Sequence, residues 1–210
     1  DRGGRRVGAV NVATGESLSF EYDNLVLAMG ALPKRPPISG SNLKGVYHLT
    51  RMEDAEAIAQ EIKDRGRGSA VIVGGGFIGV EVAEALILKK WNVTVLEREN
   101  QLFPGMLDFE ISAMIQEHFY ENRVDSEFNA EILSFEGKDG KVNQVVTRKN
   151  KYAADIVIIA AGLMPNTAIA EAAGLDLGET RALKVNTHMQ TSDPSIYAGG
   201  DMVENRHIVS

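Results

Sequence analysis

The residues that point most clearly to a chemical function form a glycine-rich turn after a short apolar run. Residues 70–79 read Ala-Val-Ile-Val-Gly-Gly-Gly-Phe-Ile-Gly, and the four apolar residues are typical of a parallel strand buried on both faces. In this spacing Gly74 allows a tight turn, Gly76 lets the backbone approach a diphosphate, and Gly79 lets the next helix lie close to the strand. That helix, expected from about 77 to 89, would direct its free N–H groups at the phosphates.

An acidic residue follows the next strand pattern at a matching distance. Residues 91–96 are rich in β-formers, and Glu97 comes directly after them, eighteen positions beyond Gly79. A carboxylate there would accept hydrogen bonds from the hydroxyl groups of an adenine-linked ribose. A glycine turn alone could be ordinary and Glu97 alone could be a solvated strand end, but strand, glycines, helix and acid together predict a nicotinamide dinucleotide site. Its candidate loop residues are Gly74, Gly75, Gly76, Phe77, Ile78 and Gly79.

Glu97 also bears on which dinucleotide would bind. A 2′-phosphate beside this carboxylate would meet like-charge repulsion, so the sequence favours NAD(H) over NADP(H). Arg98 weakens this inference, because a guanidinium next to the acid could bind the 2′-phosphate. Both residues are candidate cofactor-binding residues, and we expect NADH to bind more tightly than NADPH.

The composition excludes several classes of function. The 210 residues are 44% hydrophobic and 24% charged, with a formal charge of -7, which suits one large or two small domains with proper cores. This acidic balance argues against a nucleic-acid partner. The absence of cysteine excludes disulfides, thiolate zinc sites and thiol chemistry by these residues, and we expect no metal site.

The apolar runs of the sequence are short. The longest, residues 25–33 and 156–165, fall below the roughly 18 to 20 residues that span a bilayer, which predicts a soluble, cytoplasmic protein with no membrane partner. The chain begins with Asp1 rather than methionine, so we expect residues 1–210 to be a piece of a longer protein.

Periodicity and turn residues predict strands followed by a helix in the first third of the chain. Residues 5–13 and 17–21 form an expected hairpin, and 24–28 form a buried strand. A helix is expected from about 52 to 64, with Thr50 as its cap and one apolar stripe along it.

A second helix is expected from about 108 to 122. Its apolar stripe would consist of Ile111, Met114, Ile115 and His118. His118 could be catalytic, but a histidine at the edge of a core-facing stripe is the favoured interpretation.

The remaining pattern completes an α/β fold. Residues 124–146 read as strands with a hairpin turn at 137–140, and 155–160 read as another buried strand. Together with the glycine motif, this predicts a Rossmann-like domain that also carries a β-meander.

Two predicted strand ends look alike. One apolar run ends at Gly30 with Pro33 beyond it, and another ends at Gly162 with Pro165 beyond it. At such glycines the chain can pass close to a ligand or cross to another domain. These four residues therefore mark candidate ligand contacts or domain crossings.

Near the C-terminus, a short strand pattern at 196–198 leads to Gly200 and Asp201. Two interpretations of Asp201 stay open. Its carboxylate could accept hydrogen bonds from a sugar or sugar alcohol, or it could cap a helix.

With these motifs in order along nearly the whole chain, the sequence resembles the pyridine nucleotide-disulfide oxidoreductase superfamily. This superfamily includes NADH oxidases, coenzyme A disulfide reductases and the flavoprotein parts of nitrite reductases. The resemblance is carried by residues 22–33, 73–81, 162–166 and 196–201.

The resemblance implies a Rossmann-like NAD-binding domain at residues 34–165, inserted in a partial FAD-binding domain made of residues 1–33 and 166–210. Gly200 and Asp201 would then contact the ribityl and phosphate region of FAD. Glu81 would face the flavin and the nicotinamide as the candidate catalytic residue, and Phe77 would cover the flavin on its nicotinamide face. For these last two residues, a solvated helix turn and simple helix packing remain as alternatives.

The resemblance also implies an activity for the parent protein. It would transfer hydride from NADH to FAD and pass electrons to an unidentified acceptor. The glycine-rich FAD loop, the redox cysteines and the dimerisation domain of the family are not found in residues 1–210. The chain alone is therefore expected to be inactive, and its unfinished FAD sheet could lead to homo-oligomers. The alternative is a non-catalytic module that binds or senses NAD.

Overall fold

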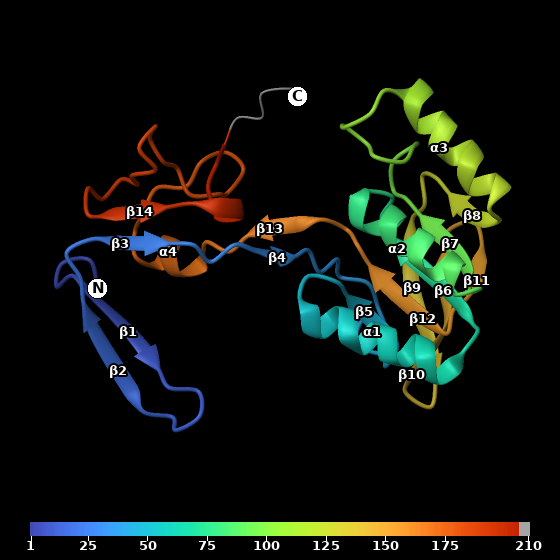
Figure 1. Ribbon diagram of the computed structural model, residues 1–210, viewed down its shortest axis with the longest axis horizontal. Helices are drawn as coiled ribbons and strands as arrows, with labels where there is room; N and C mark the ends of the chain where they lie inside the picture. The colour runs from blue at the N-terminus through green and yellow to red at the C-terminus, as the bar shows by residue number, and fades with distance from the viewer. Residues whose placement is uncertain (206–210) are drawn as a thin grey trace. The chain divides into compact units, whose positions relative to one another are not determined.

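The computed structural model describes residues 1–205, and the chain divides into two compact units (Figure 1). The first unit comprises Asp1–Leu32 and the chain from Leu163 onward, and the second comprises Pro33–Gly162. The last five residues of the predicted second FAD segment, 206–210, lie outside the described residues.

The second unit is built on a five-stranded sheet in the order β5-β12-β6-β7-β8, and all four strand pairs are parallel. The strands are β5 (Val46–His48), β12 (Ile156–Ile159), β6 (Ser69–Val73), β7 (Asn92–Leu96) and β8 (Val124–Glu127). The chain moves from β6 to β8 in one direction and places β12 and β5 on the other side. A parallel sheet whose strand order reverses beside one strand binds its ligands at that strand's carboxyl end.

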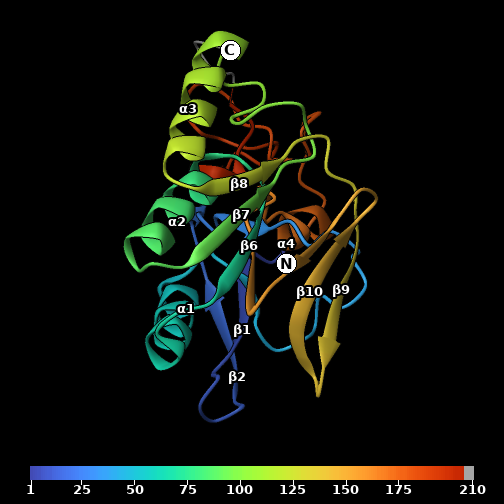
Figure 2. The ribbon, with the colours of Figure 1, turned by 90° about the vertical axis from the view of Figure 1, so that its right-hand side faces the viewer.

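Three helices cover one face of this sheet (Figure 2). They are α1 (Met52–Arg65), α2 (Phe77–Leu88) and α3 (Phe109–Glu121). Ala70 and Ile72 of β6 pack toward them in a fully buried cluster, because side chains alternate across a strand.

An antiparallel meander covers the other face (Figure 2). Its strands are β9 (Ile132–Lys138), β10 (Lys141–Thr147) and β11 (Lys151–Ala153), and they pack against Val71 and Val73. Apolar residues in β6 therefore alternate between two cores, which explains the unbroken apolar run. The predicted α/β fold with a β-meander is confirmed.

The start of α1 differs from the sequence prediction. Thr50 does not accept a capping hydrogen bond. Instead, the Asp54 carboxylate accepts hydrogen bonds from the backbone N–H of Thr50 at 3.0 Å and from that of Arg51 at 2.9 Å. It also accepts one from the Thr50 hydroxyl at 3.1 Å. Burial opposes the shift, but these hydrogen bonds hold the pKa of Asp54 below its usual value. The acid in the first turn thus fixes the helix start.

The buried face of α3 was predicted only in part: Ile115 of the predicted stripe packs against the core, but the other members do not. Ser112 and Phe119 are buried, whereas Ile111 and Met114 are 49% and 66% exposed. His118 is exposed as well and lies 3.8 Å from Glu121, so it is neither a core residue nor part of a described catalytic group. Ser112 tolerates burial because its hydroxyl donates to the Leu102 carbonyl at 2.9 Å.

The first unit contains a hairpin and a small parallel pair. The hairpin is β1 (Arg6–Val10) with β2 (Ser17–Glu21), antiparallel as predicted. The strands β3 (Leu25–Leu27) and β14 (Ile196–Ala198) pair in parallel, and the short helix α4 (Ala168–Ala172) belongs to the same core.

The segments at the unit boundaries also pair. The strands β4 (Ala31–Pro33) and β13 (Leu163–Pro165) form a two-stranded ribbon. Beside it, the backbone N–H of Lys34 donates to the Gly162 carbonyl at 2.9 Å. The two ends of Pro33–Gly162 are therefore held together directly.

Within residues 1–205, every helix is too short or too polar to cross a membrane.

Candidate functional site

The glycine loop leaves β6 in a turn that only glycine accommodates. Gly74 has φ of 112°, and a Cβ there would collide with the carbonyl of Ala160 at the end of β12. Its N–H donates to the Leu96 carbonyl at 2.9 Å, which ties the turn to β7. The tight-turn role predicted for Gly74 thus has a steric reason.

Gly79 and Gly76 differ in what surrounds them. A Cβ on the buried Gly79 would collide with the carbonyl of Gly74, so the first turn of α2 lies directly against the loop. A Cβ on Gly76 would meet no atom within 4 Å. The helix begins with its N–H groups beside this open space, which is the arrangement that binds diphosphates.

Glu97 is part of the loop structure. It is only 7% exposed, and its carboxylate accepts hydrogen bonds from the N–H of Gly75 at 2.6 Å and the N–H of Glu99 at 2.8 Å. The alternative of a solvated strand end is therefore wrong. A Cβ on Gly75 would collide with the Leu102 side chain and press on Glu97, so a larger residue at position 75 would force both side chains to shift.

Arg98, unlike this buried acid, is exposed to solvent. Its side chain is 86% exposed and pairs with Glu99 at 3.0 Å. An exposed pair of this kind contributes little to stability, so the guanidinium can move to another anion at small cost.

The first residues of α2 offer an exposed aromatic ring. Phe77 is 59% exposed, and its ring lies edge to face with that of Phe103, with 5.0 Å between centroids. Ile78 is half-buried, and Glu81 is exposed in the next turn without a hydrogen bond or ion pair to another described residue. Phe103 was missed from the sequence, because a lone phenylalanine before Pro104 carries no motif.

A second buried acid was also missed. Glu127, at the end of β8, is 7% exposed. One carboxylate oxygen accepts bonds from Tyr152 at 2.7 Å, Asn150 at 2.9 Å and Thr147 at 3.2 Å, and the other has no partner among the described residues. Burial opposes the shift, but these bonds leave the pKa of Glu127 below its ordinary value, while burial and then Glu127 raise the pKa of Tyr152 to about 12.

The first unit brings two predicted glycines to one sheet end. Because Leu27 of β3 pairs with Ala198 of β14, Gly30 and Gly200 both follow the carboxyl ends of neighbouring parallel strands. A Cβ on either glycine would meet no atom within 4 Å. The open space at paired strand ends suits a nucleotide.

Asp201 lies in the short helix Gly200–Met202. It is exposed, and the capping position of that helix belongs to Gly199. The helix-cap interpretation of Asp201 is therefore wrong, and its carboxylate is accessible to a ligand.

Gly162 and Pro165 belong to the boundary segments. Gly162 has φ of 91° and follows β12, and Pro165 is half-buried at the end of β13. Next to Pro165, the N–H of Asn166 donates to the Gly30 carbonyl at 3.0 Å. The two strand ends that look alike in sequence thus meet through Asn166 and Gly30.

Comparison with known proteins agrees with this geometry. The profile of the family described as pyridine nucleotide-disulphide oxidoreductase matches residues 1–209. The chain belongs to this family.

Several relatives within the family are similar over nearly the whole chain. The CoA-dependent NAD(P)H sulfur oxidoreductase of Pyrococcus abyssi is 39% identical over 192 residues, which cover 91% of this chain and 43% of the relative. The NAD-dependent persulfide reductase of A. fulgidus has a TM-score of 0.92 at 41% identity, and the match covers 97% of this chain and 37% of that one. A FAD-dependent pyridine nucleotide-disulphide oxidoreductase from Desulfovibrio vulgaris has a TM-score of 0.88 at 41% identity, with 97% and 51% covered. The chain spans about half or less of these relatives.

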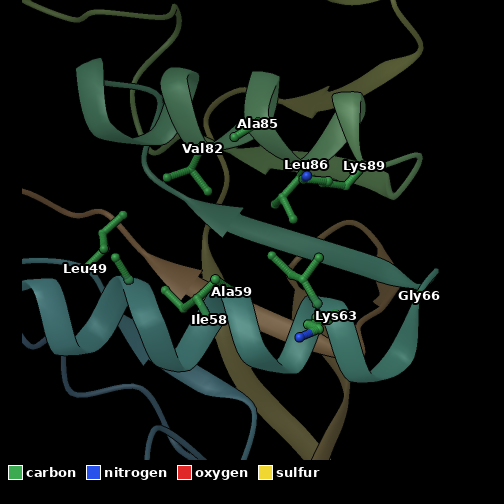
Figure 3. A pocket seen from close by; sticks show the side chains of 11 residues that line it. Leu49, Ile58, Ala59, Lys63, Gly66, Val82, Ala85, Leu86 and Lys89 are labelled. Atoms are coloured by element: carbon green, nitrogen blue, oxygen red, sulfur yellow. The ribbon is translucent and has the colours of Figure 1, made fainter.

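An apolar groove of about 550 Å³ lies away from the glycine loop of this family member, between α1 and α2 (Figure 3). Apolar side chains of both helices line it, together with Lys63 of α1 and Lys89 directly after α2. No three His, Asp or Glu side chains among residues 1–205 are grouped to hold a metal ion.

Proposed function

We propose that Pro33–Gly162 binds NADH and corresponds to the NAD-binding domain expected at residues 34–165. The supporting observation is the loop itself: Gly74 and Gly79 pack where no side chain fits, Gly76 faces open space, and the buried Glu97 orders the turn. The diphosphate would lie over Gly76 at the start of α2, and the adenosine ribose would lie at Glu97.

We further propose that residues 1–33 and 166–210 contribute part of a FAD site. The open positions at Gly30 and Gly200 and the accessible Asp201 support this assignment, because the cofactor needs close backbone approach and an acceptor for its hydroxyl groups. FAD, when bound to the complete protein, supplies the hydride acceptor and the route for electrons to the next acceptor. The residues present fit that group.

The proposed activity is an NADH-dependent, FAD-dependent oxidoreductase whose final acceptor is not assigned. In it the glycine loop would hold the diphosphate, Glu81 would help to orient the nicotinamide, and Phe77 would cover the ring site. NADH is favoured over NADPH because Glu97 is buried at the loop while Arg98 is exposed and far less constrained.

A Gly76→Ala substitution tests the NADH site. The new methyl group would enter open space, so folding should be preserved, but it would occupy the path of the diphosphate. We expect at least a tenfold rise in the Kd for NADH in a fluorescence titration. Gly8→Ala is a matched control, because its Cβ also meets nothing within 4 Å in the β1 hairpin; equal binding by both variants would contradict the proposal.

A non-catalytic NAD-binding module is the second candidate, favoured by the self-contained loop and Glu97. The open glycines at the ends of β3 and β14 argue against it, since a sensor needs no second nucleotide site. Residues 1–210 lack the first glycine-rich FAD loop of the family, so we expect the purified chain to bind NADH but little FAD. A yellow protein with a flavin absorption band would contradict this expectation.

The exposed apolar residues of the first unit support the proposal that the chain self-associates. Val26 in β3 is 67% exposed, and Phe20 in β2 is 56% exposed. Since β3 has β14 as its partner in a sheet of two strands, a further strand edge is available for pairing. Light scattering that shows only monomers would contradict it.

A further inference from the structure

Phe103 adopts a backbone conformation that is unusual for an aromatic residue. It has φ of 50° in the loop between β7 and α3, yet it is only 6% exposed. A non-glycine residue in the left-handed region carries strain and persists where its surroundings fix it. Its contacts should therefore show what the strained conformation achieves.

The backbone of Phe103 is fixed from two sides. Its N–H donates to the Gly75 carbonyl at 2.8 Å, and its own carbonyl accepts bonds from the N–H groups of Met106 and Leu107 at 3.1 and 3.2 Å. The adjacent Leu102 is fully buried and is anchored to α3 through its carbonyl. The segment thus links the glycine loop to the helix layer.

The side chain of Phe103 meets the other end of the loop. Its ring lies at 65° to that of Phe77, with centroids 5.0 Å apart, which is the favoured edge-to-face geometry. Phe103 is buried and fixed, whereas Phe77 keeps 59% of its surface exposed. The contact therefore restricts the orientation of an exposed ring next to Gly76.

We propose that Phe103 is a positioning residue that holds the Phe77 ring ready to contact the nicotinamide half of the dinucleotide. The inference rests on the proposed function: Gly76 receives the diphosphate and Glu97 the adenosine ribose, which leaves the exposed ring as the flat apolar surface for the other half. Phe103 acts through Phe77 and does not itself touch the ligand.

The test compares NADH with ADP-ribose, which lacks the nicotinamide, by calorimetry on the 210-residue chain. Phe103→Asn removes the ring but keeps the N–H, and asparagine tolerates positive φ. The Kd for NADH should rise roughly two- to tenfold, as expected for the loss of one aromatic pair. The Kd for ADP-ribose should stay unchanged, and Phe103→Tyr should retain NADH binding because it keeps the ring.

A double-mutant cycle tests whether Phe103 acts through Phe77. Phe77→Leu should weaken NADH binding, and adding Phe103→Asn to it should have no further effect. Phe109→Leu is the control, because Phe109 is 58% exposed in the same part of the chain. This substitution should leave the Kd values for NADH and ADP-ribose unchanged.

The outcomes separate this inference from the function on which it rests. Equal loss of NADH and ADP-ribose binding in Phe103→Asn, or full additivity in the cycle, would overturn the positioning role alone. A wild-type chain that binds neither ligand would overturn the proposed function and this inference with it.

Discussion

Two buried acids at the ends of neighbouring strands hold different parts of the same unit. Glu97 follows β7 and Glu127 ends β8, and the register pairs Leu96 with Glu127, so the acids are offset by one position. Each is 7% exposed. The N–H of Glu97 also donates to the Glu127 carbonyl at 2.9 Å. The carboxylates of the two acids, however, accept hydrogen bonds from different partners.

The partners determine what each acid does. Glu97 accepts from the backbone N–H of Gly75 in the glycine loop and from that of Glu99, whereas Glu127 accepts from the side chains of Thr147, Asn150 and Tyr152 in and beside the meander. The first arrangement orders the turn at the proposed NADH site, and the second connects the parallel sheet to the antiparallel meander. Burial of an acid at a strand end is therefore no sufficient sign of a binding role.

The largest expected effect is on coenzyme binding by Glu97→Gln. The substitution removes the charge that accepts hydrogen bonds from Gly75 and Glu99 and that, in the proposed site, would accept them from the ribose, so the Kd for NADH should rise roughly ten- to hundredfold. The Kd for NADPH should rise less than that for NADH, because the substitution also removes the repulsion toward the 2′-phosphate of NADPH. Titrations with both coenzymes measure this, and an unchanged preference would contradict the role of Glu97 in selectivity.

Glu127→Ala should change stability and leave binding intact. It removes the acceptor of three hydrogen bonds from a buried place, which should lower the free energy of unfolding by about 2 kcal/mol. Urea unfolding can be followed by Trp91, the single tryptophan, which is 2% exposed in the same unit. If NADH binding fell as far as in Glu97→Gln, the distinction between the two acids would be lost.

The smallest expected effect is that of Tyr152→Phe, about 1 kcal/mol, because it removes the hydroxyl that donates to Glu127 at 2.7 Å and accepts from the exposed Asn150 amide at 3.2 Å. Because folding raises the pKa of Tyr152 from 10.0 to about 12, the contribution of Tyr152 to the free energy of unfolding is complete below pH 10 and is lost as the pH rises toward 12. Folding lowers the pKa of Glu127, so the contribution of Glu127 to the free energy of unfolding is present above about pH 4.5 and is lost as the pH falls. Urea midpoints measured from pH 9 to 11.5 should fall less steeply in the variant; parallel curves would contradict the Tyr152–Glu127 bond.

The strand, turn and helix around residues 70–89 could be predicted because local chemistry fixes them. The steric needs of Gly74 and Gly79 appear directly as residue types, and Glu97 lies at a fixed spacing from them. The same holds for the turn at 137–140, where Asp139 and Gly140 both have positive φ.

The features that escaped prediction depend on contacts distant in sequence. Apolar residues occur on both sides of α3, so the choice between Ile111 with Met114 and Ser112 with Phe119 depended on what the helix packs against. Glu127 finds its partners 20 to 25 positions along the chain without a motif. The strand β5, Val46–His48, is three residues long and becomes a strand by pairing with β12.

The bond between Lys34 and Gly162 has a consequence for how this architecture can be rearranged. A segment of 130 residues begins and ends beside the hydrogen bond of 2.9 Å between the Lys34 N–H and the Gly162 carbonyl, so its two ends are adjacent, as in an insertion cassette. Such a cassette can be grafted into a surface loop of a host protein without spreading the host's own strands, or closed on itself to give a circular permutant with new termini.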